Sequence, residues 1–172
     1  LYRMLHNEPL SVMGSSASSD HTAVTAPDLR VTAPTSDKVA TSLDSDIRFG
    51  DYLQLTGLDV QSDGSQMSYG ENWRMSGGDT IDFVFEWQTL NRPDRDYSLF
   101  LHVTPADSPS PVAQADIALG TATYPTGAWR VDDRLQDIVS LTLPEDLPVD
   151  TYDVWAGIYY YADNSRLSIT ID

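Results

Sequence analysis

The chain contains no cysteine, few basic residues and no long apolar run. Its 172 residues carry 10 Lys+Arg against 26 Asp+Glu, a formal net charge of -16. The lack of cysteine excludes disulfide scaffolds, zinc–thiolate sites and thiol nucleophiles. Nucleic-acid binding is disfavoured because so few cations are available to neutralise phosphates, and an anionic membrane surface would repel the chain. Since no run approaches the ~18 apolar residues of a bilayer-spanning helix, we expect no membrane span.

Aromatic residues are also missing from most of the first quarter of the chain. None occurs between Tyr2 and Phe49, and Ser, Thr, Ala and Pro dominate from Ser11 to Asp46. Such a stretch buries too little apolar surface to offset its chain entropy. We expect residues 1–46 to form a stalk or linker, suited to O-glycosylation. The start at Leu1 suggests the trimmed end of a signal peptide, of a membrane anchor or of a longer polypeptide, and we expect an upstream segment to tether the chain.

The rest of the chain, residues 47–172, shows the pattern of an all-β domain. Short alternating runs are bounded by Gly, Pro, Asp and Asn, which is typical of strands and turns. In the clearest run, Ile81, Phe83, Phe85 and Trp87 alternate with Asp82, Val84, Glu86 and Gln88, which predicts one buried face. The other predicted strands are 51–60, 97–104, 111–117, 135–143 and 151–161, followed by a closing segment at 167–171.

No segment has convincing helical periodicity, and the Pro-rich turns would interrupt helices. We therefore predict an all-β fold: an antiparallel two-sheet sandwich, immunoglobulin-like or jelly-roll-like, of seven or eight strands with an extended N-terminal tail. Trp87 and Trp129 are expected to fill its core, and Asp79 after Gly77-Gly78 is expected to form a turn into a strand.

Catalytic signatures are weak. His6 and His21 lie in the expected stalk, and His102 lies mid-strand beside Phe100, where a structural role is favoured. Neither a G-x-S-x-G elbow nor an H-E-x-x-H motif nor a glycine-rich phosphate loop is present. The D-x-D spacing at 94–96 follows Arg92-Pro93 and is interpreted as a turn. We expect no enzyme activity and no cofactor.

Carboxylates near residue 132 have the chemistry of calcium ligands. Asp132 and Asp133, with Asp137 nearby, offer the oxygen ligands that calcium prefers. They lack the regular spacing of a calcium-binding loop, so we predict no metal site there.

The aromatic residues carry the only ligand signal. Trp155, Tyr159 and Tyr161 share the strand parity opposite Val154, and Trp73 lies in a loop-like stretch. These four side chains, Trp73, Trp155, Tyr159 and Tyr161, are the candidate ligand- or partner-binding residues. Two interpretations stay open: the rings pack against the tail, a core or a partner, or they stack on the apolar faces of sugar rings.

Several motifs together resemble a known module over residues 47–171. The sequence resembles the C-terminal extracytoplasmic β-sandwich of bacterial polytopic, mannosyltransferase-like glycosyltransferases and related cell-surface proteins. The motifs are Gly78-Asp79-Thr80 with IDFVFEWQTL, RPDRDY with SLFLHV, PVAQAD, YPTGAW, LTLPEDL and the segment Tyr152 to Tyr159. The catalytic acid of that family resides in a membrane-embedded part that this chain lacks, so the resemblance assigns no catalytic residue.

Two functions follow as expectations. The first is a non-catalytic accessory or assembly module, held outside the cytoplasm and contacting other protein subunits of a cell-surface or membrane-associated complex. The second is a carbohydrate-binding module for cell-envelope glycans, accessory to a glycosyltransferase. Both expectations involve an extracytoplasmic location, periplasmic or at the cell surface, with tethering through an upstream segment.

Overall fold

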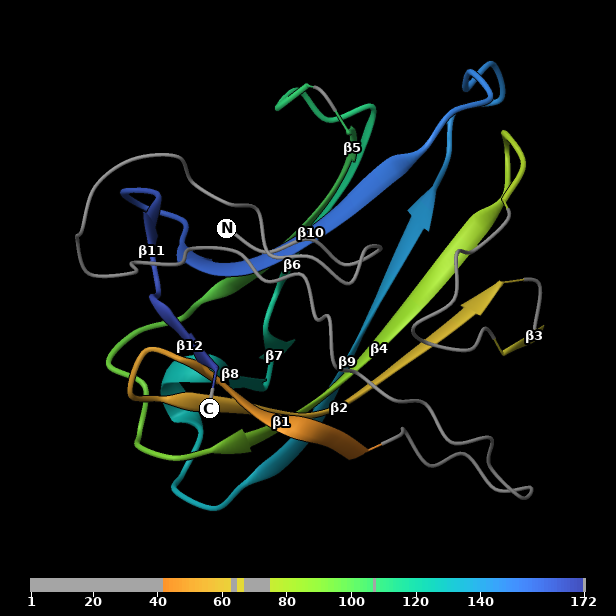
Figure 1. The fold of residues 1–172 in the computed structure, drawn as a ribbon. Helices are drawn as coiled ribbons and strands as arrows, with labels where there is room; N and C mark the ends of the chain where they lie inside the picture. Colours follow the sequence, from red (N-terminus) through yellow and green to blue (C-terminus); the bar gives the residue numbers. More distant parts are fainter. Residues whose placement is uncertain (1–41, 63–64, 67–74, 107, 172) are drawn as a thin grey trace.

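The computed structural model describes residues 42–62, 65–66, 75–106 and 108–171 (Figure 1). Most of the expected stalk therefore lies outside the described residues. Within them the chain forms β-strands and one 3₁₀ turn, η1 (Thr126–Ala128). In this part of the chain, no helix has the length and apolar character needed to cross a membrane.

The larger sheet, sheet A, is antiparallel and follows the order β12-β1-β2-β4-β9, with β3 paired beside β2. Its strands are β1 (Ser42–Phe49), β2 (Leu53–Ser62), β3 (Ser65–Gln66), β4 (Thr80–Thr89), β9 (Arg134–Thr142) and β12 (Ile169–Ile171).

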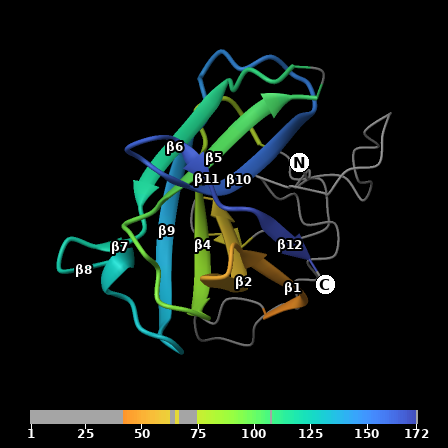
Figure 2. The ribbon, with the colours of Figure 1, turned by 90° about the vertical axis from the view of Figure 1, so that its left-hand side faces the viewer.

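The second sheet, sheet B, is also antiparallel and follows the order β11-β10-β5-β6. Its strands are β5 (Ser98–Pro105), β6 (Ala113–Ala118), β10 (Tyr152–Tyr160) and β11 (Ser165–Arg166). The two sheets lie face to face (Figure 2). A short hairpin of β7 (Gly120–Thr121) and β8 (Tyr124–Pro125) leads from β6 of sheet B toward β9 of sheet A. The two-sheet sandwich predicted from the alternating pattern is thereby confirmed.

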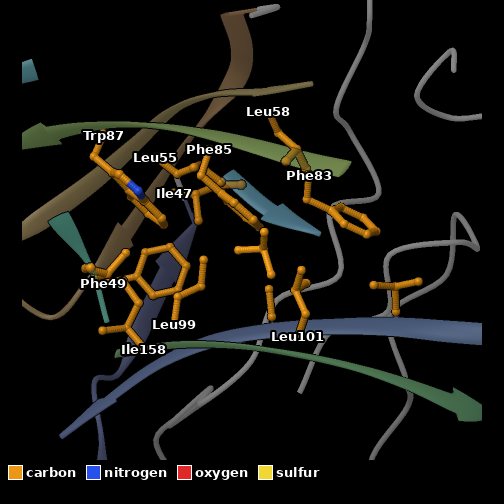
Figure 3. Close-up of a cluster of buried hydrophobic side chains, with 14 of the residues drawn as sticks. Ile47, Phe49, Leu55, Leu58, Phe83, Phe85, Trp87, Leu99, Leu101 and Ile158 are labelled. Carbon is orange, nitrogen blue, oxygen red and sulfur yellow. The ribbon is translucent and has the colours of Figure 1, made fainter. Parts of the chain in front are cut away.

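Apolar side chains from both sheets meet between the layers (Figure 3). Trp87 is fully buried, stacks on Phe85 with ring centroids 5.6 Å apart and meets the edge of Phe49 at 5.5 Å. Leu99, Leu101 and Ile158 face them from sheet B. Aromatic rings supply much of this core, and such pairs stabilise it beyond their buried area by about 0.5–1.5 kcal/mol each.

The strand positions agree with the alternating pattern. The burial of β4 alternates along its whole length, so Ile81, Phe83, Phe85 and Trp87 point inward as predicted. In β10, Val154, Ala156 and Ile158 are buried, also as predicted. Strand β1 begins at Ser42, within the segment expected to be stalk, and directs Ile47 and Phe49 into the core.

Strand β2 contains a register irregularity. Leu55 pairs with Trp87 and Gly57 with Glu86, so Thr56 is an extra residue opposite the regular ladder of β4. Such a bulge shifts the inward parity by one position. For this reason Leu53 and Leu55 before the bulge, and Leu58 and Val60 after it, all face the core.

The corner beside β9 is built around Gly120 and Trp129. Gly120 has φ +82°, and an added Cβ there would lie 2.5 Å from the Tyr124 carbonyl oxygen and 2.9 Å from Trp129 Nε1. Trp129 is fully buried and donates its indole N–H to the same Tyr124 carbonyl at 3.1 Å. The YPTGAW segment thus wraps around a core tryptophan, which confirms the core position expected for Trp129.

Candidate binding face on the outer side of sheet B

An aromatic surface lies on the side of sheet B that faces away from the core. We call it the aromatic face. Strand β5 contributes Phe100 and His102, and β10 contributes Trp155 and Tyr159, because these residues have the parity opposite the buried Leu99, Leu101, Ala156 and Ile158. Asp116 of β6 and Arg166 of β11 border the rings.

Hydrogen bonds hold both β10 rings of this face in place. The Trp155 indole N–H donates to Thr104 Oγ1 at 2.8 Å, and the Tyr159 hydroxyl donates to Asp116 Oδ1 at 3.0 Å. Both rings are half-buried. Each ring is therefore fixed by a polar group on another strand of sheet B, Thr104 on β5 and Asp116 on β6, while part of its surface stays accessible.

Phe100 lies at the centre of the aromatic face and supports its neighbours. Its ring centroid is 4.8 Å from that of His102 and 6.1 Å from that of Tyr159. The Arg166 guanidinium lies over the Phe100 ring, 4.8 Å from its centroid, in a cation–π contact. Phe100 itself is only 4% exposed, so it positions the surrounding groups and offers little surface to a ligand.

Burial affects two titrating groups on this face. Partial desolvation lowers the pKa of His102, with the nearby Asp116 opposing and Arg166 reinforcing the shift. A neutral imidazole can both donate and accept a hydrogen bond. Burial also raises the pKa of Tyr159, as does its hydrogen bond to Asp116. Tyr159 therefore keeps its hydroxyl proton.

Of the four predicted site residues, the structure brings two together on one face. Trp155 and Tyr159 share the aromatic face. Tyr161 follows the end of β10 and is 77% exposed. Trp73 lies outside the described residues. The predicted strand 97–104 (YSLFLHVT) is apolar on both faces, and this is the sequence signal that points to Phe100. The neighbouring Asp116 and Arg166 join the site only through strand pairing.

The D-x-D motif serves the fold, as the turn interpretation predicted. Asp94 accepts hydrogen bonds from Arg95 Nη2 at 2.7 Å and from the Tyr97 hydroxyl at 2.8 Å, and these contacts lower its pKa. Asp96 accepts a bond from the Gly127 backbone N–H at 2.9 Å. Arg95 also lies over the Tyr160 ring, 4.8 Å from its centroid. Protein donors therefore occupy both carboxylates.

Asp133 and Asp137, near position 132, accept hydrogen bonds from different groups of the protein. Asp133 accepts from the Tyr124 hydroxyl at 2.5 Å and from the Arg130 N–H at 2.7 Å. Asp137 is buried and accepts from the Gly120 N–H. Across the described ranges, no group of three or more His, Cys, Asp or Glu residues is placed to hold a metal ion.

Comparisons with known proteins add little to this geometry. The chain matches no family model, and no curated protein matches it. Among solved structures, the C-terminal domain of Wzt aligns with 74% of this chain and 72% of its own length, at 13% identity and a TM-score of 0.49. A likeness of this size carries no argument about function, so the glycosyltransferase-module resemblance stays a prediction.

Proposed function

We propose that this chain is a non-catalytic carbohydrate-binding module that holds a neutral oligosaccharide on the aromatic face. The observation that carries the proposal is the pair of fixed, half-buried rings, Trp155 and Tyr159, flanked by polar groups. Aromatic faces stack on the apolar sides of sugar rings, while polar side chains beside them accept and donate hydrogen bonds to hydroxyls.

The spacing of the two rings indicates the size of the ligand. Trp155 and Tyr159 are four residues apart on one strand, a distance of about 13 Å along the strand axis. This exceeds one pyranose ring, so a ligand that touches both must contain several sugar units. The polar groups next to the rings are His102, Asp116, Arg166 and the exposed Gln114 on β6.

Fixed rings also reduce the entropic cost of binding. A side chain that is ordered before the ligand arrives loses less conformational freedom, which otherwise costs about 0.5–1.5 kcal/mol for each immobilised side chain. Stacking and hydrogen bonding to an uncharged ligand depend little on ionic strength. We therefore expect binding that added salt does not abolish.

Glycan-array screening and calorimetry of the full chain test this proposal. At least one neutral polysaccharide should bind, and Trp155→Ala should weaken binding at least about tenfold, the equivalent of ~1.4 kcal/mol. Tyr161→Ala is the matched control, because it removes an exposed ring outside the strand. Unchanged binding by a folded Trp155→Ala protein, or no neutral glycan ligand, would reject the proposal.

A protein partner is the second candidate, and Tyr161 favours it. This ring is 77% exposed directly after β10, next to the aromatic face. Exposed tyrosines are enriched among the residues that dominate protein interfaces. If the module serves assembly, Tyr161→Ala should disrupt a complex recovered from the source cells. In that case neither the wild type nor Trp155→Ala should bind a sugar.

The proposal also includes an extracytoplasmic location, as expected from the sequence. Cell fractionation with an antibody to the sandwich domain checks it. Recovery with the cytoplasmic proteins would contradict this part of the proposal without affecting the binding assignment.

A further inference from the structure

The free edge of sheet B presents unpaired backbone groups. Among the described residues, β6 pairs with β5 and with no other strand (Figure 2). The Leu119 N–H donates to the Tyr97 carbonyl next to this ladder. Because bonded residues alternate in an antiparallel ladder, Ala113, Ala115 and Ile117 bond toward β5. The N–H and C=O groups of Gln114, Asp116 and Ala118 therefore point to the free edge.

The other sheet edges are short or flanked. Strands β11 and β12 have only 2 and 3 residues. Strand β9 lies against β7, whose Gly120 N–H bonds to Asp137. Short edge strands and covering segments are two of the ways in which proteins prevent unwanted strand pairing. Strand β6, with 6 residues, is longer than β11 and β12, and although β9 of sheet A packs near it, no described strand hydrogen-bonds to its outer edge.

Strand β6 also carries few protective residues, with Asp116 as its one charged side chain. Its sequence, AQADIA, contains no Lys, Pro or Gly, and its register with β5 is regular from end to end. Three small alanines keep the strand accessible. Along the same edge, the inward side chains of Ala113, Ala115 and Ile117 are only half-buried, so the rim of the core is open to a further strand.

We propose that a second copy of this chain pairs along this edge, β6 against β6, antiparallel about a twofold axis at Ala115. Outward side chains must meet outward side chains, because faces are continuous across a sheet. With the axis at Ala115, Gln114 lies opposite the partner's Asp116, and the same pair recurs on the other side of the axis. Each of these pairs exchanges both backbone hydrogen bonds.

Charge selects this register over its neighbour. Moving the axis to Asp116 would set that carboxylate directly opposite the partner's Asp116, and like charges facing each other across a ladder are destabilising. With the axis at Ala115, the amide of Gln114 can donate to the partner's Asp116. Charge complementarity therefore favours the axis at Ala115 over the axis at Asp116.

Pairing would join two aromatic faces into one sheet surface. Asp116 binds the Tyr159 hydroxyl, so the two faces would meet on either side of the new seam. A ligand with repeated sugar units could then contact both copies, and linked sites raise avidity through their effective concentration. The pairing itself does not depend on what the face binds, so its failure and the failure of the proposed function are distinguishable.

Because of the net charge, the stability of the dimer should depend on salt concentration. Two copies of a chain with a formal charge of -16 repel each other at long range. Added salt screens this repulsion, since the Debye length falls to about 3 Å at 1 M ionic strength. The dimer should therefore strengthen as salt rises.

Sedimentation equilibrium of the full chain, across protein and salt concentrations, tests the proposal. A reversible dimer favoured by salt is expected. Gln114→Pro should shift it to monomer, because it removes an N–H that points to the free edge and leaves the bonds to β5 intact. A wild-type chain that stays monomeric at high protein and salt concentration would overturn the proposal.

A cysteine substitution tests the register independently. The chain has no cysteine, so Ala115→Cys introduces a single thiol. At the axis, two such residues form a non-hydrogen-bonded pair with Cα atoms about 4.5 Å apart, within disulfide range. Mild oxidation should link most of this variant into dimers. The control, Ala113→Cys, faces the partner's Ile117 and should stay unlinked. Equal linking of both variants, or none for Ala115→Cys, would contradict the register.

Discussion

The carboxylate of Asp137 accepts a hydrogen bond from the backbone N–H of Gly120 at 2.9 Å, inside the corner where β9 meets the β7–β8 hairpin. Burial raises the pKa of Asp137, and the Gly120 bond opposes this shift. The indole N–H of Trp87 also favours the ionised form, although it does not reach hydrogen-bond geometry with a described residue. Desolvation has the larger effect, so the corner holds a carboxyl that binds its proton more tightly than usual.

This arrangement predicts that Asp137 makes folding less favourable as pH rises. A raised pKa means that the folded chain binds the proton more readily than the unfolded chain. The contribution of Asp137 to the free energy of unfolding should therefore increase as pH falls through its folded pKa, and level off below the ordinary value of 3.8. Urea unfolding of the wild type and Asp137→Asn at several pH values measures this.

The prediction concerns the difference in the free energy of unfolding between Asp137→Asn and the wild type. The free energy of unfolding of Asp137→Asn, relative to wild type, should rise with pH over the acid side of neutrality. Asp146→Asn, in an exposed loop, controls for the loss of one negative charge. A flat difference for Asp137→Asn would show that this carboxyl does not titrate differently in the folded chain.

Trp87 should carry a large share of the core stability. Its ring is fully buried against Phe85 and Phe49. Trp87→Ala should lower the free energy of unfolding by about 3–5 kcal/mol, as large-to-small core changes do. Trp155→Ala should cost clearly less, because its ring is half-buried. Chemical denaturation compares the two, and a loss below about 1 kcal/mol for Trp87→Ala would contradict the buried register.

Gly78 and Gly120 have similar positive φ angles but different surroundings. Alanine substitutions at the two positions therefore distinguish the cost of backbone strain from the cost of steric crowding. Gly78 has φ +86°, and an added Cβ would find only the Glu145 side chain, at 3.7 Å. Gly78→Ala should therefore cost about 1–2 kcal/mol from the left-handed backbone alone. Gly120→Ala should cost more, because its Cβ would also collide with the Tyr124 carbonyl and the Trp129 indole. Thermal unfolding of both variants checks the order, and equal losses would exclude the crowding argument.

The sandwich should fold without the expected stalk. A fragment of residues 47–172 keeps Ile47 and Phe49 in β1, together with almost all the aromatic residues. It should unfold cooperatively without metal or disulfide. A fragment of residues 50–172 lacks both side chains and should lose most of this cooperativity. Calorimetry of the two fragments is the test, and a non-cooperative 47–172 fragment would mean that the stalk or a partner completes the core.

The long strands could be predicted from sequence because their alternation is itself the burial pattern. In β4, each second residue is apolar, and the structure buries each of these. Strand β1 was harder to detect, since SLDSDIRF contains only Leu43, Ile47 and Phe49 as large apolar residues within a polar stretch. Two-residue strands such as β7 and β8 are too short to show a period at all.

For the candidate site, the sequence predicts which residues of one strand share a face, but not which strands lie next to each other. Parity placed Trp155 and Tyr159 on one side of β10. The Asp116 carboxylate that binds Tyr159 lies on β6, 43 residues away in sequence, and two strand registers bring it there. Arg166 over Phe100 is a similar case. Contacts of this kind depend on the pairing of strands, which periodicity within one strand does not specify.

The extra residue in β2 bears on how this chain tolerates changes of length. Removing Thr56 would leave Leu55 opposite Trp87 and Gly57 opposite Glu86, which is a regular ladder. Every leucine on either side would keep its direction, so a deletion at this point would exchange no core residue for a solvent-facing one. Deletion of Asp59, three residues later, would instead turn each following side chain of β2 to the opposite face of the sheet. The bulge therefore marks a position where the chain can lose one residue while the same side chains still fill the core.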